Sequence, residues 1–129
     1  MKIGFDYWHV CTRYPAYFQS LATLALAAGH EVYVVSVVSP DYPGSVRAEI
    51  AALGIPVTAV HQITFTKPGQ SAQLKVSRCL ELGIAVFYDT RDDVCRMLAA
   101  RSVLAMRVIL PDRRSRMSTA AQSGPDLMP

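Results

Sequence analysis

Short apolar runs alternate along the chain with stretches in which apolar residues recur every three or four positions. The runs, several of them rich in β-branched residues, are typical of buried strands, and the periodic stretches are typical of amphipathic helices. Strands are predicted at residues 2–6, 31–38, 55–60, 84–88 and 106–110, and helices at 15–28, 45–53, 71–82 and 92–100. Residues 8–14 and 61–70 are predicted to be irregular.

Turn-forming residues support these limits. Pro15 suits the first turn of a helix, and Ser45 suits a helix N-cap. Gly29, Gly54 and Gly83 each follow a predicted helix, where glycine commonly ends the helix.

The regular alternation of strand and helix predicts the fold class. Parallel strands joined by helices need cover on both faces of their sheet. We therefore expect an α/β protein: a three-layer Rossmann-like fold with a central parallel sheet of about five strands. The domain is expected to span residues 1–111, and residues 112–129, rich in Ser, Arg, Pro and Gly, are expected to form a disordered tail.

Composition narrows the class of protein. The chain has 129 residues, of which 51% are hydrophobic, enough for one globular domain. Its net charge of +3 comes from scattered basic residues, so nucleic acid is an unlikely partner. Three cysteines without CxxC spacing indicate reduced thiols in a cytoplasmic protein and argue against a cysteine metal site. We expect no signal peptide, because Asp6 interrupts the N-terminal segment, and no membrane span, because no apolar run reaches the required length.

Polar residues occur where the predicted strands end. Asp6 and Asp89 end the first and fourth strands, Ser36 lies near the end of the second, and Lys75 lies in the first turns of a helix. The carboxyl ends of parallel strands form the edge at which such sheets bind ligands. Two carboxylates suit Mg²⁺, and a lysine with a hydroxyl suits a phosphate brought in by that metal.

In this order, the residues resemble the four motifs of the haloacid dehalogenase superfamily. The resemblance covers residues 1 to about 110 and rests on KIGFDYWHV (2–10), VYVVS (32–36), LKVSRCLELGI (74–84) and AVFYDTRDD (85–93). The segments between the motifs leave no room for an inserted cap, so the chain resembles the capless type.

The resemblance implies a Mg²⁺-dependent phosphohydrolase that acts through an aspartyl-phosphate. Its substrate would be a phosphorylated small molecule or macromolecule. The implied roles are Asp6 as nucleophile, Ser36 and Lys75 as catalytic and phosphate-binding groups, and Asp6, Asp89, Asp93 and the Trp8 backbone carbonyl as Mg²⁺ ligands.

Two positions depart from the family pattern. Trp8 stands where the family has a second Asp, which serves as general acid and base, and Trp has no proton to exchange. Loss of such help typically costs about 10²–10⁴-fold in rate. His9 is a candidate substitute proton donor and substrate contact. Thr90 stands where relatives with adjacent acids have a second Asp, and Asp93 could compensate.

Other interpretations remain open. The chain could be an inactive relative that binds a phosphorylated ligand or regulates a partner. Residues 17–36 are also similar to the opening of two-domain glycosyltransferases, without their Gly-rich loop. Ordinary structural roles exist as well: a loop cap for Asp6, a satisfied strand hydroxyl for Ser36, a solvated charge for Lys75 and a helix N-cap for Asp93. Self-association into a homo-oligomer is left open.

Overall fold

The computed structural model describes residues 1–111. The tail predicted for residues 112–129 lies outside the described residues, so the structure does not test it. The described residues form, in chain order, β1 (Lys2–Phe5), η1 (Tyr7–Cys11), α1 (Pro15–Ala27), β2 (Glu31–Val38), α2 (Val46–Ala52), β3 (Ala59–Thr64), α3 (Ser71–Leu82), β4 (Val86–Asp89), α4 (Asp92–Ala100) and β5 (Leu104–Arg107).

The helices begin and end close to the predicted positions. α1 begins at Pro15, whose missing N–H and fixed φ suit the first turn. Ser45 caps α2, because its hydroxyl oxygen accepts a hydrogen bond of 3.2 Å from the Ala48 N–H. α3 ends at Gly83, whose φ of 74° is left-handed and costs glycine little.

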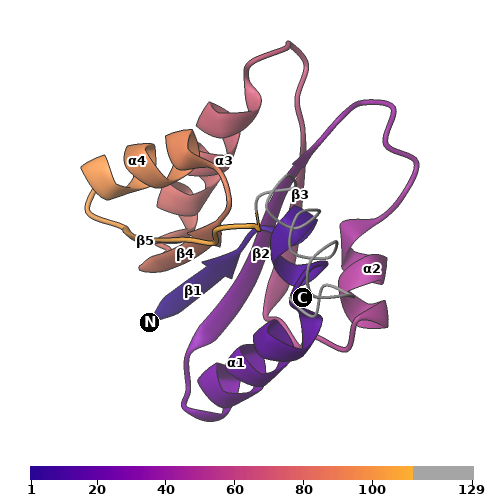
Figure 1. Cartoon of the computed structure of the whole chain (residues 1–129), viewed down its shortest axis with the longest axis vertical. Helices are drawn as coiled ribbons and strands as arrows, with labels where there is room; N and C mark the ends of the chain where they lie inside the picture. The colour runs from indigo at the N-terminus through magenta and orange to yellow at the C-terminus, as the bar shows by residue number, and fades with distance from the viewer. Residues whose placement is uncertain (112–129) are drawn as a thin grey trace, which may run out of the picture.

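The five strands form one parallel sheet in the order β3-β2-β1-β4-β5 (Figure 1). The chain first builds outward from β1 through β2 to β3, and then returns to the other side of β1 with β4 and β5. The sheet therefore reverses its strand order between β1 and β4. Open α/β sheets bind ligands beside such a switch point, at the carboxyl ends of the strands.

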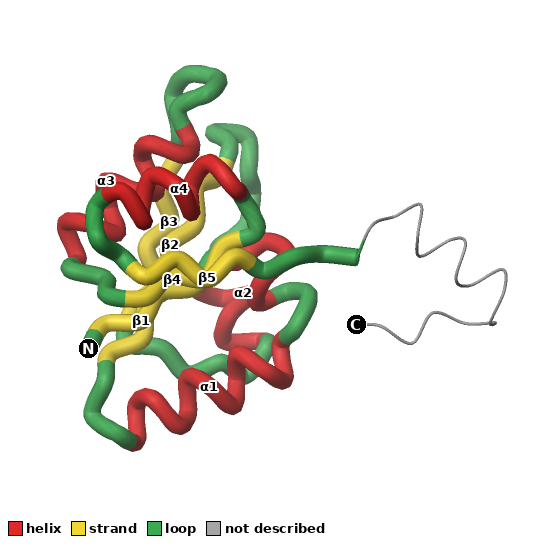
Figure 2. The backbone as a smooth tube through the Cα atoms, turned by 60° about the vertical axis from the view of Figure 1, so that its left-hand side comes forward, coloured by secondary structure: helices red, strands yellow, loops and turns green. Residues whose placement is uncertain are grey.

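Helices cover both faces of the sheet, with α1 and α2 on one side and α3 and α4 on the other (Figure 2). Each face has its own apolar core, one around Phe5 and Phe18 and the other around Phe87. Adjacent residues of β2 alternate between them, since Val34 belongs to the first core and Val35 to the second. The predicted α/β Rossmann-like fold with a five-stranded parallel sheet is confirmed.

The third strand lies four residues later than predicted. Residues 55–60 are predicted as strand, but β3 is Ala59–Thr64, paired with β2 from Tyr33↔Ala59 to Val38↔Thr64. Residues 61–64 are thus strand, although they are predicted to be irregular. The register with β2 decides the position, which the apolar content of residues 55–60 did not reveal.

The fifth strand is also displaced, from residues 106–110 to Leu104–Arg107. Its start is determined by pairing with β4, because the Leu104 N–H donates a hydrogen bond of 3.0 Å to the Ala85 carbonyl. Residues 8–14 are predicted to be irregular, and the first of them form, with Tyr7, the irregular helical turn η1.

Within residues 1–111, no helix combines the length and the apolar character that crossing a membrane requires. The cytoplasmic location stays a prediction.

Candidate functional site

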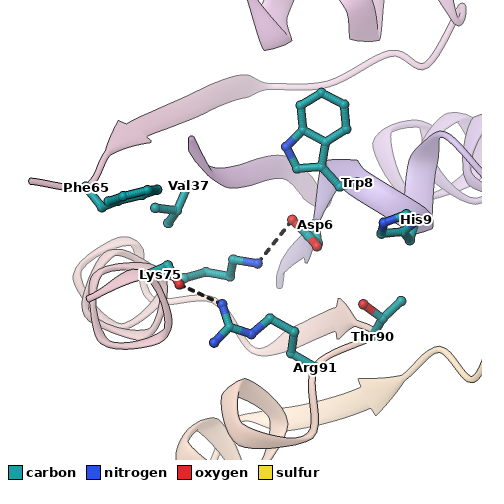
Figure 3. Close-up of a pocket in the computed structure, with 9 residues that line it drawn as sticks. Asp6, Trp8, His9, Val37, Phe65, Lys75, Thr90 and Arg91 are labelled. Atoms are coloured by element: carbon teal, nitrogen blue, oxygen red, sulfur yellow. Dashed lines mark hydrogen bonds and ion pairs between the residues drawn. The ribbon is translucent and has the colours of Figure 1, made fainter. Parts of the chain in front are cut away.

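A pocket of about 230 Å³ opens at the carboxyl ends of the strands, beside the switch point between β1 and β4 (Figure 3). Its walls come from the turn after β1, the ends of β2 and β3, the start of α3 and the segment after β4. The residues that line it are Asp6, Trp8, His9, Val37, Phe65, Ser71, Lys75, Thr90 and Arg91.

The turn after β1 brings three of these side chains to the pocket. Asp6 begins the turn and accepts a hydrogen bond of 2.9 Å from the Tyr7 N–H. Trp8 has extended backbone and His9 has a φ of 63°, a left-handed conformation that His adopts more readily than most residues. The His9 N–H is bonded to the Thr12 hydroxyl oxygen at 2.9 Å. These local bonds hold Asp6, Trp8 and His9 at the pocket.

A lysine between two carboxylates forms the floor of the site. The Lys75 Nζ lies 3.1 Å from Asp6 Oδ1 and 2.9 Å from Asp89 Oδ2. All three residues are buried, and Asp89 is fully enclosed. The second oxygen of Asp89 accepts a hydrogen bond of 3.0 Å from the Arg91 N–H. Asp89 therefore holds the Lys75 ammonium through an ion pair, although Asp89 itself does not line the pocket.

Burial raises the pKa of the Asp6 carboxyl from 3.8 to about 6, because losing water penalises the charged form. Lys75 acts against this shift and Asp89 adds to it. Burial also acts to lower the pKa of Lys75, but the two carboxylates outweigh it and the pKa of the ammonium is raised overall. Near neutral pH the site thus holds a charged lysine and an aspartate close to its own titration range.

Arg91 forms the rim of the pocket. Its guanidinium donates to Ser71 Oγ at 2.7 Å, and to both oxygens of Asp93 at 3.1 and 2.7 Å. This contact is the main cause of the lowered pKa of Asp93. Ser71 is the first residue of α3, so Arg91 joins the start of that helix to the end of β4.

Aromatic side chains supply an apolar wall. Trp8 is 37% exposed and packs edge-on against Tyr42, with ring centroids 5.6 Å apart. Figure 3 shows Trp8 and Phe65 on the side of the pocket opposite Arg91. The pocket therefore has a charged side and an aromatic side.

The structure brings together most of the predicted site residues. Asp6, Lys75 and Asp89 converge, and Trp8 and His9 line the same pocket.

Apart from Asp89, which touches the pocket only through Lys75, two predicted residues lie outside the pocket. Ser36 is fully buried, and its Oγ has no hydrogen-bond partner among the described residues. Because Val37 lines the pocket, the alternation of β2 turns Ser36 to the opposite face of the sheet. Asp93 is exposed and bound to Arg91, away from Lys75.

The position between the two carboxylates, which a bridging Mg²⁺ would need, is taken by the Lys75 ammonium. Among residues 1–111, no group of three or more His, Cys, Asp or Glu side chains is arranged to hold a metal ion. Mg²⁺ stays a prediction from the sequence alone.

Sequence reasoning missed Phe65, Ser71 and Arg91 as pocket residues. Phe65 directly follows β3, and placing that strand too early hid it. Ser71 is the first residue of the helix predicted at 71–82, and that position did not show that its side chain faces a pocket. Arg91 follows Asp89 by two residues, so its place at the end of a predicted strand was a usable signal.

No protein family model matches the sequence, and no curated protein matches it. Several solved structures, in contrast, have a fold similar to that of this chain. A chain of the Pnkp1/Rnl/Hen1 complex has a TM-score of 0.65 at 15% identity, covering 86% of this chain and 47% of that one. A chain of the Pnkp1/Rnl/Hen1 RNA repair complex has a TM-score of 0.66 at 15% identity, covering 86% and 43%. This chain thus spans less than half the length of either.

The third structure is similar in size. It is the crystal structure of a protein from the universal stress protein family from Burkholderia pseudomallei, with a TM-score of 0.53 at 16% identity, covering 84% of this chain and 96% of that one. The fold is similar to that of a universal stress protein. At this identity the likeness shows the fold alone.

The predicted membership of the haloacid dehalogenase superfamily is wrong, because the similar structures are a universal stress protein and chains of an RNA repair complex. The prediction of a capless phosphatase that acts through an aspartyl-phosphate at Asp6 depends on that membership and is wrong for the same reason. The inactive member of that superfamily and the glycosyltransferase fragment are wrong as family assignments too, whereas binding of a phosphorylated ligand is a separate prediction that these structures do not test. Polar residues at the ends of buried strands are common to doubly wound sheets, so their order did not specify a family.

Proposed function

We propose that the chain binds a phosphorylated small molecule in the pocket beside the switch point. The observation that carries this proposal is that two cationic side chains, Lys75 and Arg91, and the start of α3 meet at one pocket. Sheets with this kind of topology bind ligands at the same place. The fold likeness to a universal stress protein concerns the fold alone and says nothing about the ligand.

The start of α3 favours an anion. Ser71 lines the pocket, and the N-cap residue Gln70 makes no side-chain capping bond to the helix. The first N–H groups of a helix carry a partial positive charge and bind phosphate readily. A phosphate bound beside Ser71 would lie near these N–H groups and near Lys75 and Arg91, which line the same pocket.

Arg91 is able to exchange its present partner for a ligand. Asp93, which holds the guanidinium, has a side chain that is 54% exposed. Exposed ion pairs of this kind contribute only about 0–1 kcal/mol. A phosphate forms shorter, charge-assisted bonds to arginine and competes with that carboxylate.

The aromatic side of the pocket suits the organic part of the ligand. Trp8 and Phe65 offer apolar ring surface opposite Arg91. A volume of about 230 Å³ is slightly below the roughly 300–1,000 Å³ of ordinary ligand pockets. The ligand is therefore small.

Three sequence-based predictions about partners stay predictions. They are binding of a phosphorylated macromolecule, absence of nucleic-acid binding, and self-association.

Arg91→Gln is expected to weaken the binding of phenyl phosphate about 10–100-fold, since hydrogen bonds to charged groups contribute about 1.5–3 kcal/mol. The measurement is a calorimetric titration of the full chain with phenyl phosphate, and with phenol as the ligand that lacks the phosphate. Wild type is expected to bind phenyl phosphate and not phenol.

Arg96→Gln is the matched control. Arg96 lies on α4, is 78% exposed and pairs with Asp92 outside the pocket. It should leave the affinity for phenyl phosphate unchanged. Equal affinities of wild type and the Arg91 variant, or equal binding of phenol and phenyl phosphate, contradict the proposed function.

A further inference from the structure

One carboxylate oxygen at the floor of the pocket has no partner. Both contacts to the Asp6 carboxyl go to the same atom, because the Tyr7 N–H and the Lys75 ammonium each bond Oδ1. Among the described residues, none forms a hydrogen bond to Oδ2. Asp6 is only 5% exposed and lines the pocket, and Figure 3 shows its second oxygen turned away from Lys75. Oδ2 thus belongs to a largely buried side chain but lies at the pocket surface, where a ligand or solvent in the pocket can reach it.

The charge at this floor is unfavourable for an anion. Asp6 and Asp89 share a single ammonium, so the buried trio carries one excess negative charge when both carboxyls are ionised. A phosphate oxygen that enters the pocket meets the unpartnered Oδ2. Two oxygens without a proton between them repel each other, and burial strengthens the repulsion.

We propose that the pocket takes up its anionic ligand together with one proton, which Asp6 Oδ2 carries and donates to a ligand oxygen. This inference rests on the proposed function and adds its regulation: affinity rises as the pH falls. The ligand class is an oxyanion that accepts a hydrogen bond, such as a phosphate ester or sulfate. No covalent bond changes, since the proton comes from solvent and returns there when the ligand leaves.

Asp6 is the group that takes the proton because Asp89 has no free oxygen. Asp89 Oδ1 accepts from the Arg91 N–H and Oδ2 binds Lys75, in a fully buried environment. The raised pKa of Asp6, about 6, agrees with this assignment, since burial disfavours its charged form. Protonation of Oδ2 leaves the bonds at Oδ1 intact.

Other titratable groups surround Asp6 and have to be separated from it. They come from its own turn, from α3 and from the end of β4. They are Tyr7, His9, Cys11, Lys75, Cys79, Asp89 and Arg91, the last held by Asp93. Burial raises the pKa of both thiols to about 12, so they stay neutral at the pH values used below. His9 lines the same pocket, so it is the neighbour that most needs a control variant.

The test uses sulfate, which stays fully ionised between pH 5.5 and 7.5, so any proton taken up belongs to the protein. Binding to the full chain is followed at pH 5.5, 6.5 and 7.5 by the shifts of backbone amide resonances. Wild type is expected to lose affinity on the order of tenfold for each pH unit above about 6, since only the protonated fraction binds. Calorimetry in two buffers of different ionisation enthalpy should show uptake of a proton above pH 6.

Three variants assign the proton. Asp6→Asn places an amide donor at the pocket floor, so its affinity for sulfate should no longer depend on pH and should exceed that of wild type at pH 7.5. His9→Gln and the matched Asp41→Asn, an exposed residue between β2 and α2, should keep the pH dependence of wild type.

The outcomes separate the two proposals. Sulfate binding that is independent of pH in wild type, or a pH dependence that persists in Asp6→Asn or disappears in His9→Gln, overturns the proton coupling and leaves the proposed function standing. Failure of wild type to bind either sulfate or phenyl phosphate at any of the three pH values overturns both.

Discussion

Lys75→Met is expected to lower the free energy of unfolding by about 3–5 kcal/mol at pH 7, because it leaves two buried carboxylates without a counter-charge. The lysine contacts both Asp6 and Asp89, and its side chain is only 5% exposed. Methionine keeps most of the side-chain volume, so the loss is electrostatic rather than a cavity effect. Urea unfolding of both proteins, with equal slopes, measures the difference.

The pH dependence of this loss identifies its cause. The folded-state pKa of Asp6 is already raised above its unfolded value, with burial as the main cause, and removing Lys75 raises it further. The native state of the variant therefore binds protons more readily than its unfolded state, so its stability rises as the pH falls through 6 towards 4. Wild-type Asp6 itself takes up its proton near pH 6, so the deficit relative to wild type should shrink as the pH falls from above neutrality towards 6, the range in which Asp6 is protonated in the native variant and still ionised in native wild type. Lys67→Met, in an exposed loop, should change stability by no more than about 0.5 kcal/mol. A deficit that does not change with pH contradicts the electrostatic explanation.

Phe87→Ala is expected to cost about 3–5 kcal/mol of unfolding free energy, the range for losing a buried aromatic ring. Phe87 is fully buried in the core beneath α3 and α4 and lies on β4, directly opposite Gly4 of β1. The loss should appear as a lower urea midpoint, with the slope unchanged.

Gly4 tests the same contact from the other strand. A methyl group at position 4 would lie 2.5 Å from a ring carbon of Phe87, so Gly4→Ala should cost about 1–3 kcal/mol by overpacking. In the Phe87→Ala background the methyl enters the vacated space, and the same substitution should cost much less or stabilise the protein. Additive effects of the two substitutions would show that the ring does not determine the need for glycine in β1.

How far the sequence predicts this protein differs between elements and site. α3 is found over the predicted residues, since its apolar spacing and Gly83 act within one short segment. β3 is found later than predicted, since its place depends on which residues of β2 it pairs with. That pairing spans two strands separated by a helix and leaves no mark in the local pattern.

The site shows the same division. Asp6 and Asp89 were predicted because each ends an apolar strand, and their convergence follows from parallel pairing of β1 with β4. Ser36 also lies near a strand end, but the pleat turns its side chain to the other face from Val37. Arg91 reaches the pocket through bonds to Ser71 and Asp93, from two different helices. The haloacid dehalogenase resemblance came from strand-end chemistry that many doubly wound sheets share.

The sequence by itself determined the α/β class, the helices and the presence of two acids and a lysine near strand ends. Apolar periodicity and turn residues act over a few neighbouring positions, so a single chain displays them directly. Only the tertiary structure decided that Lys75 lies between Asp6 and Asp89, that Ser36 faces away, and that Asp6 presents one unpartnered oxygen to the pocket. These features depend on strand register and on which face each side chain takes, and contacts between distant segments determine both.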